Sequence, residues 1–207
     1  MMKKLASLAF SVVASIMLIA AVAPVTPVFA NTPTDQANPL SPEEIREKYV
    51  DKMDLKSEDV LGFYYTTMKG SSDARVHNIK KAAKRLNGEM LDPHETFSYN
   101  QTVGNSNLAD EGWRQAGVIV GGQLVDGYGG GICQVSSTLF NAVTDAKMTV
   151  TERHSHSKRV GYVPVGMDAT VAYGFMDLQF VNPFDFQVKI KAKVYDGDKV
   201  VIAIVRA

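Results

Sequence analysis

Cysteine and tryptophan are almost absent from this sequence, since each occurs once in 207 residues. A single cysteine, Cys133, cannot form an intramolecular disulfide, so a scaffold held together by disulfide bonds is excluded. The thiol needs another explanation. It is either a small buried apolar residue, because cysteine is among the residue types buried most often, or a group that carries chemistry.

The sequence also lacks an excess of charge of either sign. It has 22 basic and 22 acidic side chains, which gives a formal net charge of zero. Nucleic-acid-binding proteins usually carry a basic excess, so nucleic acid is not an expected partner. A phosphate-binding loop is not indicated either, because no Gly-Lys-Ser/Thr follows the glycine-rich segment 127–131.

The first 30 residues have the pattern of a secretory signal peptide. Lys3 and Lys4 precede an apolar stretch over residues 5–23, and a small-residue ending at Ala30 follows. We expect export and cleavage after Ala30, which would leave a net charge of −2. The apolar stretch is nearly long enough to cross a bilayer, so an uncleaved membrane anchor is the alternative. Residues 31–42 are polar and proline-rich, which predicts a flexible tether before a single domain over residues 43–207.

Two helices are predicted in the N-terminal half. Ser41 followed by Pro42 and two glutamates predicts the start of a short helix over residues 42–51. The segment 73–90 carries apolar residues at alternating steps of three and four, as in an amphipathic helix. We expect its basic face to be solvated, although contact with an anionic wall polymer is an alternative. That face consists of Arg75, Lys80, Lys81, Lys84 and Arg85.

The C-terminal third has the period of β-structure. Apolar and polar residues alternate over residues 186–195, Asp196-Gly197 is a turn signal, and residues 199–205 return, which predicts an antiparallel hairpin. Helices early in the chain and strands late predict an α+β fold. Shorter strands are expected at residues 62–68, 148–153, 168–173 and 177–181.

The segment 112–131 contains half of the 16 glycines of the chain. Glycines permit positive φ angles and the close approach of a ligand. The apolar spacing of residues 132–146 then predicts a helix, with Cys133 in its first turn. The positive end of a helix favours a thiolate, and Cys133 lies off the apolar face. These two points favour a catalytic thiol over a buried one.

A thiolate nucleophile needs a base, and two of the four histidines, His154 and His156, follow this helix. On a strand they would point to the same face, and we favour His156 as the base. One alternative is that both lie unused in an exposed loop. Another is a zinc site with Cys133 and either Asp168 or Asp177, which explains the glycines and the helix start less well. We therefore predict no metal and no cofactor.

Three segments of the sequence resemble the VanW-like family. They are Gly129-Gly-Gly-Ile-Cys-Gln-Val-Ser-Ser-Thr-Leu-Phe-Asn141, Glu152-Arg-His-Ser-His-Ser157 and Tyr162-Val-Pro-Val-Gly-Met-Asp-Ala-Thr-Val171. Thr96-Phe-Ser-Tyr-Asn100 is similar to an earlier motif of the family. Where the family usually has Pro-Gly-Glu, this chain has Pro93-His94-Glu95, so His94 is a substitution and not a candidate catalytic group.

The resemblance implies an exported, cell-wall-associated protein of Gram-positive type. Some family members are cysteine L,D-transpeptidases, although this chain lacks the Ser-His-Gly-Cys signature of the other L,D-transpeptidases. The hypothesis is acyl transfer between peptidoglycan stem peptides through a thioester on Cys133, with carboxypeptidase activity when water is the acceptor. The alternative is a non-catalytic peptidoglycan-binding or glycopeptide-resistance accessory protein.

Site residues follow from this chemistry and from the shared motifs. His156 would move the proton, His154 is its rival, and Asp168 would orient the imidazole. Backbone N–H groups between Gly131 and Gln134 would bind the oxyanion, with the Gln134 amide as a further donor. The remaining candidates for oxyanion or substrate binding are Gly130, Gly131, Ser136, Ser137, Arg153 and Tyr162.

Overall fold

The computed structural model of this chain describes residues 40–207, which form one compact unit. The signal peptide predicted for residues 1–30 and the tether up to residue 39 lie outside the described residues. Within residues 40–207, no helix combines the length and the apolar character that a membrane crossing needs.

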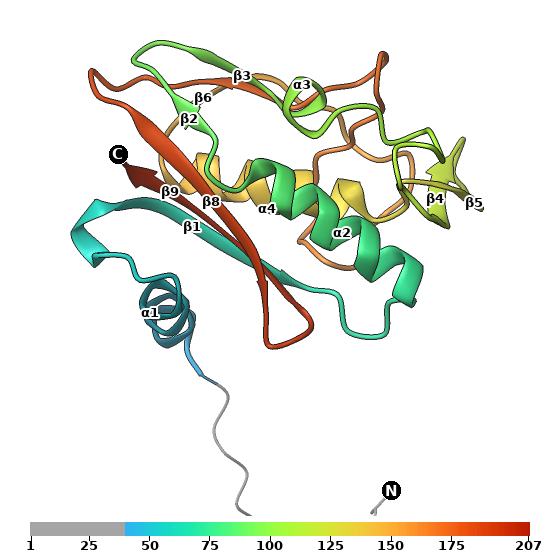
Figure 1. Ribbon diagram of the computed structural model, residues 1–207, viewed down its shortest axis with the longest axis horizontal. Helices are drawn as coiled ribbons and strands as arrows, with labels where there is room; N and C mark the ends of the chain where they lie inside the picture. Colours follow the sequence, from blue (N-terminus) through green and yellow to red (C-terminus); the bar gives the residue numbers. More distant parts are fainter. Residues whose placement is uncertain (1–39) are drawn as a thin grey trace, which may run out of the picture. The chain divides into compact units, whose positions relative to one another are not determined.

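The largest sheet has four antiparallel strands in the order β1-β9-β8-β2 (Figure 1). Its centre is the predicted C-terminal hairpin, which turns through Asp196 and Gly197, both with positive φ. Together with the helices, this sheet confirms the predicted α+β fold. The strands are β1 (Val60–Thr67), β2 (Met90–Leu91), β8 (Val188–Tyr195) and β9 (Lys199–Arg206).

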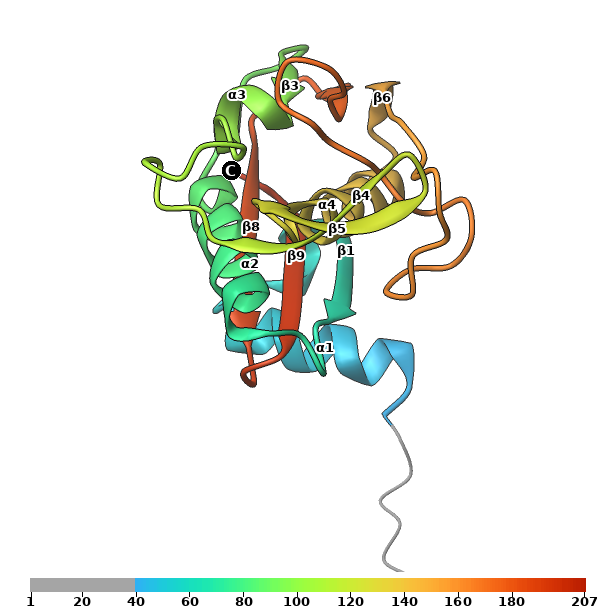
Figure 2. The same ribbon diagram turned by 90° about the vertical axis from the view of Figure 1, so that its right-hand side faces the viewer.

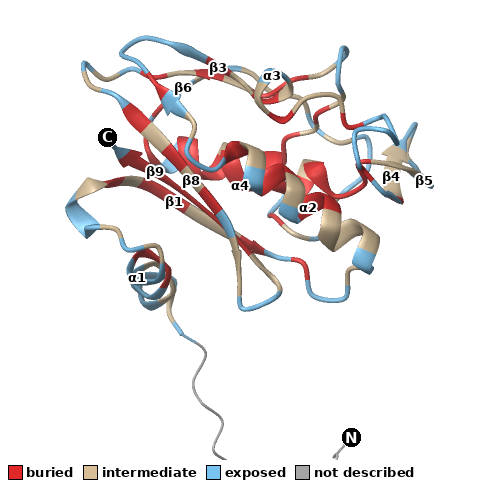
Figure 3. Ribbon diagram, viewed as in Figure 1, coloured by how far each residue is buried: buried red, intermediate tan, exposed pale blue. Residues whose placement is uncertain are grey.

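Helices cover both faces of this sheet. Helices α2 (Asp73–Leu86) and α4 (Ile132–Asp145) pack on one face, and α1 (Pro42–Lys52) packs on the other (Figures 1 and 3). Strand β9 is therefore buried on both sides. Its residues 200, 202 and 204 join the core beneath α2 and α4, and residues 201, 203 and 205 join the core beneath α1.

A three-stranded sheet holds α4 from the opposite side. Its order is β3 (Thr96–Ser98), β7 (Gln179–Val181) and β6 (Thr149–Glu152), and it is antiparallel throughout. Phe97 stacks on Phe180 with ring centroids 4.6 Å apart. In the short helix α3 (Tyr99–Val103), the Tyr99 hydroxyl donates to the carbonyl of Ile132 at 3.1 Å. The beginning of α4, where Cys133 lies, is thereby anchored to a second layer.

The glycine-rich segment contains a hairpin that the sequence analysis did not predict. Strands β4 (Gln115–Val120) and β5 (Gln123–Tyr128) pair in register around Gly121 and Gly122, which both have positive φ. Figures 1 and 2 show this hairpin beside the N-terminal end of α4. Four of the glycines before Cys133 lie within this hairpin, at positions 117, 121, 122 and 127.

Three local predictions were wrong. The helix expected over residues 73–90 ends at Leu86, because the chain turns through Asn87 and Gly88 and then enters β2. The strand expected at residues 168–173 is reduced to two isolated bridges, one of which pairs Thr170 with His154. Strand β6 ends at Glu152, so His154 and His156 do not share the face of a strand.

Candidate active site

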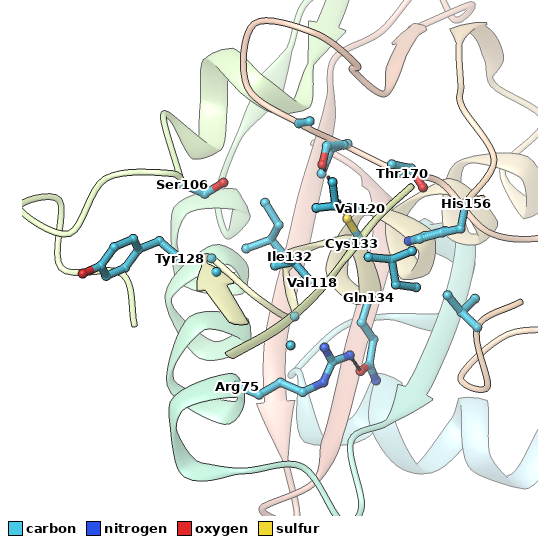
Figure 4. A pocket seen from close by; sticks show the side chains of 18 of the residues that line it. Arg75, Ser106, Val118, Val120, Tyr128, Ile132, Cys133, Gln134, His156 and Thr170 are labelled. Carbon is cyan, nitrogen blue, oxygen red and sulfur yellow. Dashed lines mark hydrogen bonds between the residues drawn. The ribbon is translucent and has the colours of Figure 1, made fainter. Parts of the chain in front are cut away.

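A cavity of about 320 Å³ lies at the N-terminal end of α4 (Figure 4). One wall is the β4–β5 hairpin, which contributes apolar side chains such as Val118, Val120 and Leu124. No Asp or Glu of the described residues lines it. Its polar lining includes Arg75, Ser106, Asn107, Cys133, Gln134, His156, Tyr162 and Thr170.

The three glycines before α4 make room for other parts of the protein. A Cβ on Gly129 would lie 2.7 Å from the carbonyl oxygen of Ser106, and one on Gly130 would lie 2.6 Å from the backbone of Ala116. A Cβ on Gly131, whose φ is +110°, would lie 3.0 Å from the side chain of Arg75. The glycines were expected to permit the close approach of a ligand, but the groups that approach them are parts of the protein itself. Gly131 also lines the cavity, whereas Gly130 does not.

Cys133 is the second residue of α4, and its thiol faces the cavity from a partly buried position. Its Sγ lies 3.5 Å from the carbonyl oxygen of Val171, which the thiol proton can approach. Burial raises the pKa of Cys133, while the hydrogen bond with Val171 and the charge of Arg75 lower it less. The backbone N–H of Cys133 at the helix start also lowers this pKa, but burial has the larger effect. The resting group is a thiol that needs a base.

His156 is the histidine that the fold brings to Cys133. Its Nδ1 lies 2.7 Å from Oδ2 of Asp168, which also accepts the His156 backbone N–H at 2.7 Å. A carboxylate can only accept, so Nδ1 carries a proton, and in the neutral imidazole the lone pair is on Nε2. Figure 4 shows the imidazole extending toward Cys133, and its side chain is 6% exposed. Asp168 therefore fixes the orientation of an imidazole that lines the same cavity as Cys133.

Arg153 donates hydrogen bonds to both the backbone and the side chain of Asp168. Its Nε donates to the Asp168 carbonyl at 2.6 Å, and a terminal nitrogen donates to Oδ1 at 2.9 Å. Burial opposes ionisation of Asp168, but hydrogen bonds from His156 outweigh it and lower the pKa of this carboxyl. Arg153 itself does not line the cavity. The structure therefore gives this predicted substrate-binding residue a different place, in which it supports the His156–Asp168 pair.

His154 lies apart from the cavity. Its Nε2 is 2.9 Å from Oε1 of Glu152, and its side chain is 40% exposed. The zinc alternative required His154 beside Cys133, and this juxtaposition does not occur. Across residues 40–207, no three His, Cys, Asp or Glu side chains group in a way that could hold a metal ion.

Ser136 and Ser137 are buried and do not line the cavity, contrary to their predicted role as substrate contacts. The Ser136 hydroxyl donates to the Ala169 carbonyl at 2.6 Å, and Ser137 accepts the Ala169 N–H at 2.9 Å. Ser137 also donates to the carbonyl of Cys133 at 2.7 Å. The two serines fasten α4 to the segment that carries Asp168, and so fix Cys133 relative to His156.

The predicted oxyanion donors are mostly engaged already. The Gln134 amide nitrogen donates to the Thr67 carbonyl at 2.9 Å and to the Thr66 hydroxyl at 3.1 Å, so this amide is not free. The backbone N–H groups of Ile132 and Gln134 donate within the turn that begins the helix. The N–H groups of Gly131 and Cys133 donate to no other residue in the described part of the chain, and both residues line the cavity, which leaves these two groups as the candidate oxyanion donors.

Arg75 is a cavity residue that the sequence analysis placed on a solvated face. It donates to Oε1 of Gln134 at 2.9 Å, and its guanidinium lies 5.9 Å from the ring centre of Tyr162. The missed signal was its spacing, since Arg75 precedes the core residue Ile79 by four positions and shares its helix face. Tyr162, predicted as a site residue, also lines the cavity, with its hydroxyl 3.4 Å from Nε2 of His156.

Comparison with known proteins decides the family. The sequence model described as "VanW like protein" matches residues 74–205, which is more than half of the chain. The chain belongs to the VanW-like family. This confirms the resemblance noted from the sequence, and the match contains every site residue described above.

Two relatives within the family are informative. The chain is 45% identical over 141 residues to YoaR of Bacillus subtilis, an uncharacterized protein. The aligned residues cover 68% of this chain and 46% of the relative. The chain is 32% identical over 132 residues to the vancomycin B-type resistance protein VanW of Enterococcus faecalis, which covers 61% and 47%. The matches span just under half the length of these curated relatives. No solved structure matches the chain.

Proposed function

We propose that this protein is an exported cysteine acyltransferase that acts on peptidoglycan stem peptides, with the reaction of an L,D-transpeptidase. The observation that carries the proposal is the placement of Cys133 and His156 in one cavity, with Nδ1 of His156 bonded to Asp168 at 2.7 Å. A thiol, a base and a carboxylate that orients the base are the parts that covalent acyl transfer needs.

The first half-reaction forms a thioester. His156 Nε2 takes the proton of Cys133, and the sulfur attacks the carbonyl of the diamino acid in a stem tetrapeptide. The N–H of Cys133 stabilises the oxyanion of the tetrahedral intermediate. The carbon–nitrogen bond to the terminal D-alanine then breaks, and His156 returns its proton to the leaving amine.

The second half-reaction transfers the acyl group. The side-chain amine of a second stem peptide attacks the thioester carbonyl and gives its proton to His156. The carbon–sulfur bond breaks, the proton returns to the sulfur, and a cross-link between two diamino acids is released. Water in place of the amine yields a free carboxylic acid, so carboxypeptidase activity would accompany poor exclusion of water.

Two further observations support a role at the cell wall. The relative in Enterococcus faecalis is named for vancomycin B-type resistance. Residues 1–30 of this chain carry the sequence pattern of an export signal. We propose from these observations that the protein works outside the cytoplasmic membrane.

The test is product formation by the purified full chain. Incubation with a stem tetrapeptide should yield free D-alanine and a cross-linked dimer, both measured by mass spectrometry. Cys133→Ala and Cys133→Ser should abolish both products, and His154→Gln, which alters a histidine outside the cavity, should retain them. Equal product from Cys133→Ala and the wild-type chain would refute the proposal.

A non-catalytic role in peptidoglycan binding is the second candidate. It is favoured by the burial of Cys133, which raises the pKa of the thiol and keeps it neutral at rest. This role predicts that Cys133→Ala binds isolated cell walls as the wild-type chain does, and that neither protein alters the cross-links.

A further inference from the structure

Arg75 is a cation without an acidic partner in the described part of the chain. None of the ion pairs found among residues 40–207 includes Arg75, and its one side-chain hydrogen bond is to Oε1 of Gln134. A guanidinium has five N–H donors, so most of its capacity is unused. A partly buried charge without a partner is costly, and a ligand of opposite charge would offset that cost.

The cavity around Arg75 carries no negative charge to offset it. The carboxylate of Asp168 already has hydrogen-bond partners in His156 and Arg153. The apolar wall formed by the β4–β5 hairpin reduces solvent screening and strengthens attraction to an anion.

The guanidinium is also held in a fixed place. The Arg75 side chain packs against Gly131, where a Cβ would lie only 3.0 Å from Cγ of Arg75. Gln134, which accepts from Arg75, is itself held by Thr66 and Thr67 from β1. A cation fixed in this way loses little entropy when it binds, which raises its affinity for a ligand.

We propose that Arg75 binds the terminal carboxylate of the donor peptide, on the residue that leaves during acylation. Arginine and a carboxylate form paired, charge-assisted hydrogen bonds of fixed geometry. Arg75 and Cys133 line the same cavity, and the terminal carboxylate of a tetrapeptide lies only one residue, roughly 4 Å, beyond the scissile carbonyl. This inference rests on the proposed function, because it assumes that Cys133 attacks that carbonyl.

The consequence is a rule for substrate length. Arg75 selects a donor that ends one residue past the scissile bond, since only there does a free carboxylate lie within its reach. A donor with an amidated or extended end leaves the cation unpaired and loses that affinity. Arg75 is on this account a specificity-determining residue.

The test measures binding in a full chain that cannot react. In Cys133→Ala, isothermal calorimetry compares a stem tetrapeptide acid with the same peptide carrying a C-terminal amide. The amide should bind at least about tenfold more weakly, because a charge-assisted pair is lost. Arg75→Gln in the same background should bring the ratio close to one, and Arg75→Lys should give an intermediate ratio. Lys80→Gln removes an exposed charge from the same helix and should leave the ratio unchanged.

The outcomes separate this inference from the proposed function. Equal binding of acid and amide by Cys133→Ala overturns the inference even if the Arg75 variants do not fold. The internal carboxylates of the peptide are the other source of negative charge, and a peptide amidated at these groups tests them. If only that peptide loses affinity, and the loss depends on Arg75, the inference is overturned. A tenfold preference of Cys133→Ala for the acid, together with a wild-type chain that forms no products, would support carboxylate binding by Arg75 and refute the proposed enzyme.

Discussion

Two hairpins in the described part of the chain have similar apolar content and opposite surroundings. In the β8–β9 hairpin, residues 200–205 are all buried between helices. In the β4–β5 hairpin, Val120, Leu124 and Val125 are 63%, 68% and 44% exposed. Local sequence makes both segments into hairpins, and the elements that pack on each hairpin decide whether its apolar side chains are buried. The first stabilises the fold, whereas the second leaves one face for the cavity.

The β4–β5 hairpin is held over the site at few points. The backbone N–H of Gly122 at its tip donates to the hydroxyl of Ser157 at 3.0 Å, which ties it to the segment that carries His156. A Cβ on Gly130 would collide with Ala116 at its base. The comparison therefore predicts that changes near the cavity affect activity and leave stability nearly intact, and that changes in the C-terminal hairpin do the reverse.

The largest expected effect is that of His156→Ala on turnover. Loss of the general base should reduce the rate of product formation by about 10²–10⁴-fold. The matched change His154→Gln should reduce it less than about threefold. The check is the steady-state rate of D-alanine release, with the thermal midpoint of each variant as a control for folding. Similar losses in both variants would show that His156 has no special role.

A contrast between the hairpins comes next. Ile202 is fully buried in β9, so Ile202→Ala should lower the free energy of unfolding by about 2–5 kcal/mol. Leu124 lines the cavity and is mostly exposed, so Leu124→Ala should change the free energy of unfolding by less than about 1 kcal/mol. The same substitution should raise KM. Urea denaturation and tetrapeptide kinetics measure the two quantities. A large loss of stability in Leu124→Ala would break the comparison.

The smallest effect concerns the pH at which Cys133 reacts. The positive charge of Arg75 lowers the pKa of the thiol, against the larger effect of burial. Arg75→Gln should therefore raise the pKa further and move the iodoacetamide alkylation profile to higher pH, with Lys80→Gln as the matched control. A profile that stays in place, or moves to lower pH, would contradict the electrostatic coupling of these two side chains.

The parts of the fold that the sequence predicted were those with strong local signals. Ser41 and Glu44 form the reciprocal hydrogen bonds of a capping box at the start of α1. The alternation over residues 188–195 and the Asp196-Gly197 turn produced the C-terminal hairpin in register. The apolar spacing from Ile132 placed Cys133 correctly in the first turn of α4.

The parts that escaped prediction depend on contacts distant in sequence. Glycines at 117, 121, 122 and 127 lowered the β-propensity of the β4–β5 hairpin, which pairs nonetheless. The spacing of Arg75 from Ile79 indicates that it shares the buried helix face, but its contact with Gly131, more than fifty residues later, has no local signal. The hydrogen bonds of Ser137 with Ala169 and of Arg153 with Asp168 likewise appear only once the chain folds around the segment that carries Asp168.

The central claim is that Cys133 is a nucleophile, and the intact mass of the full chain tests it most directly. After incubation with a stem tetrapeptide and an acid quench, the wild-type chain should gain the mass of the peptide less its D-alanine. The adduct should map to Cys133 and be absent from Cys133→Ala. An unmodified thiol while products accumulate, or the same adduct in Cys133→Ala, would contradict the account.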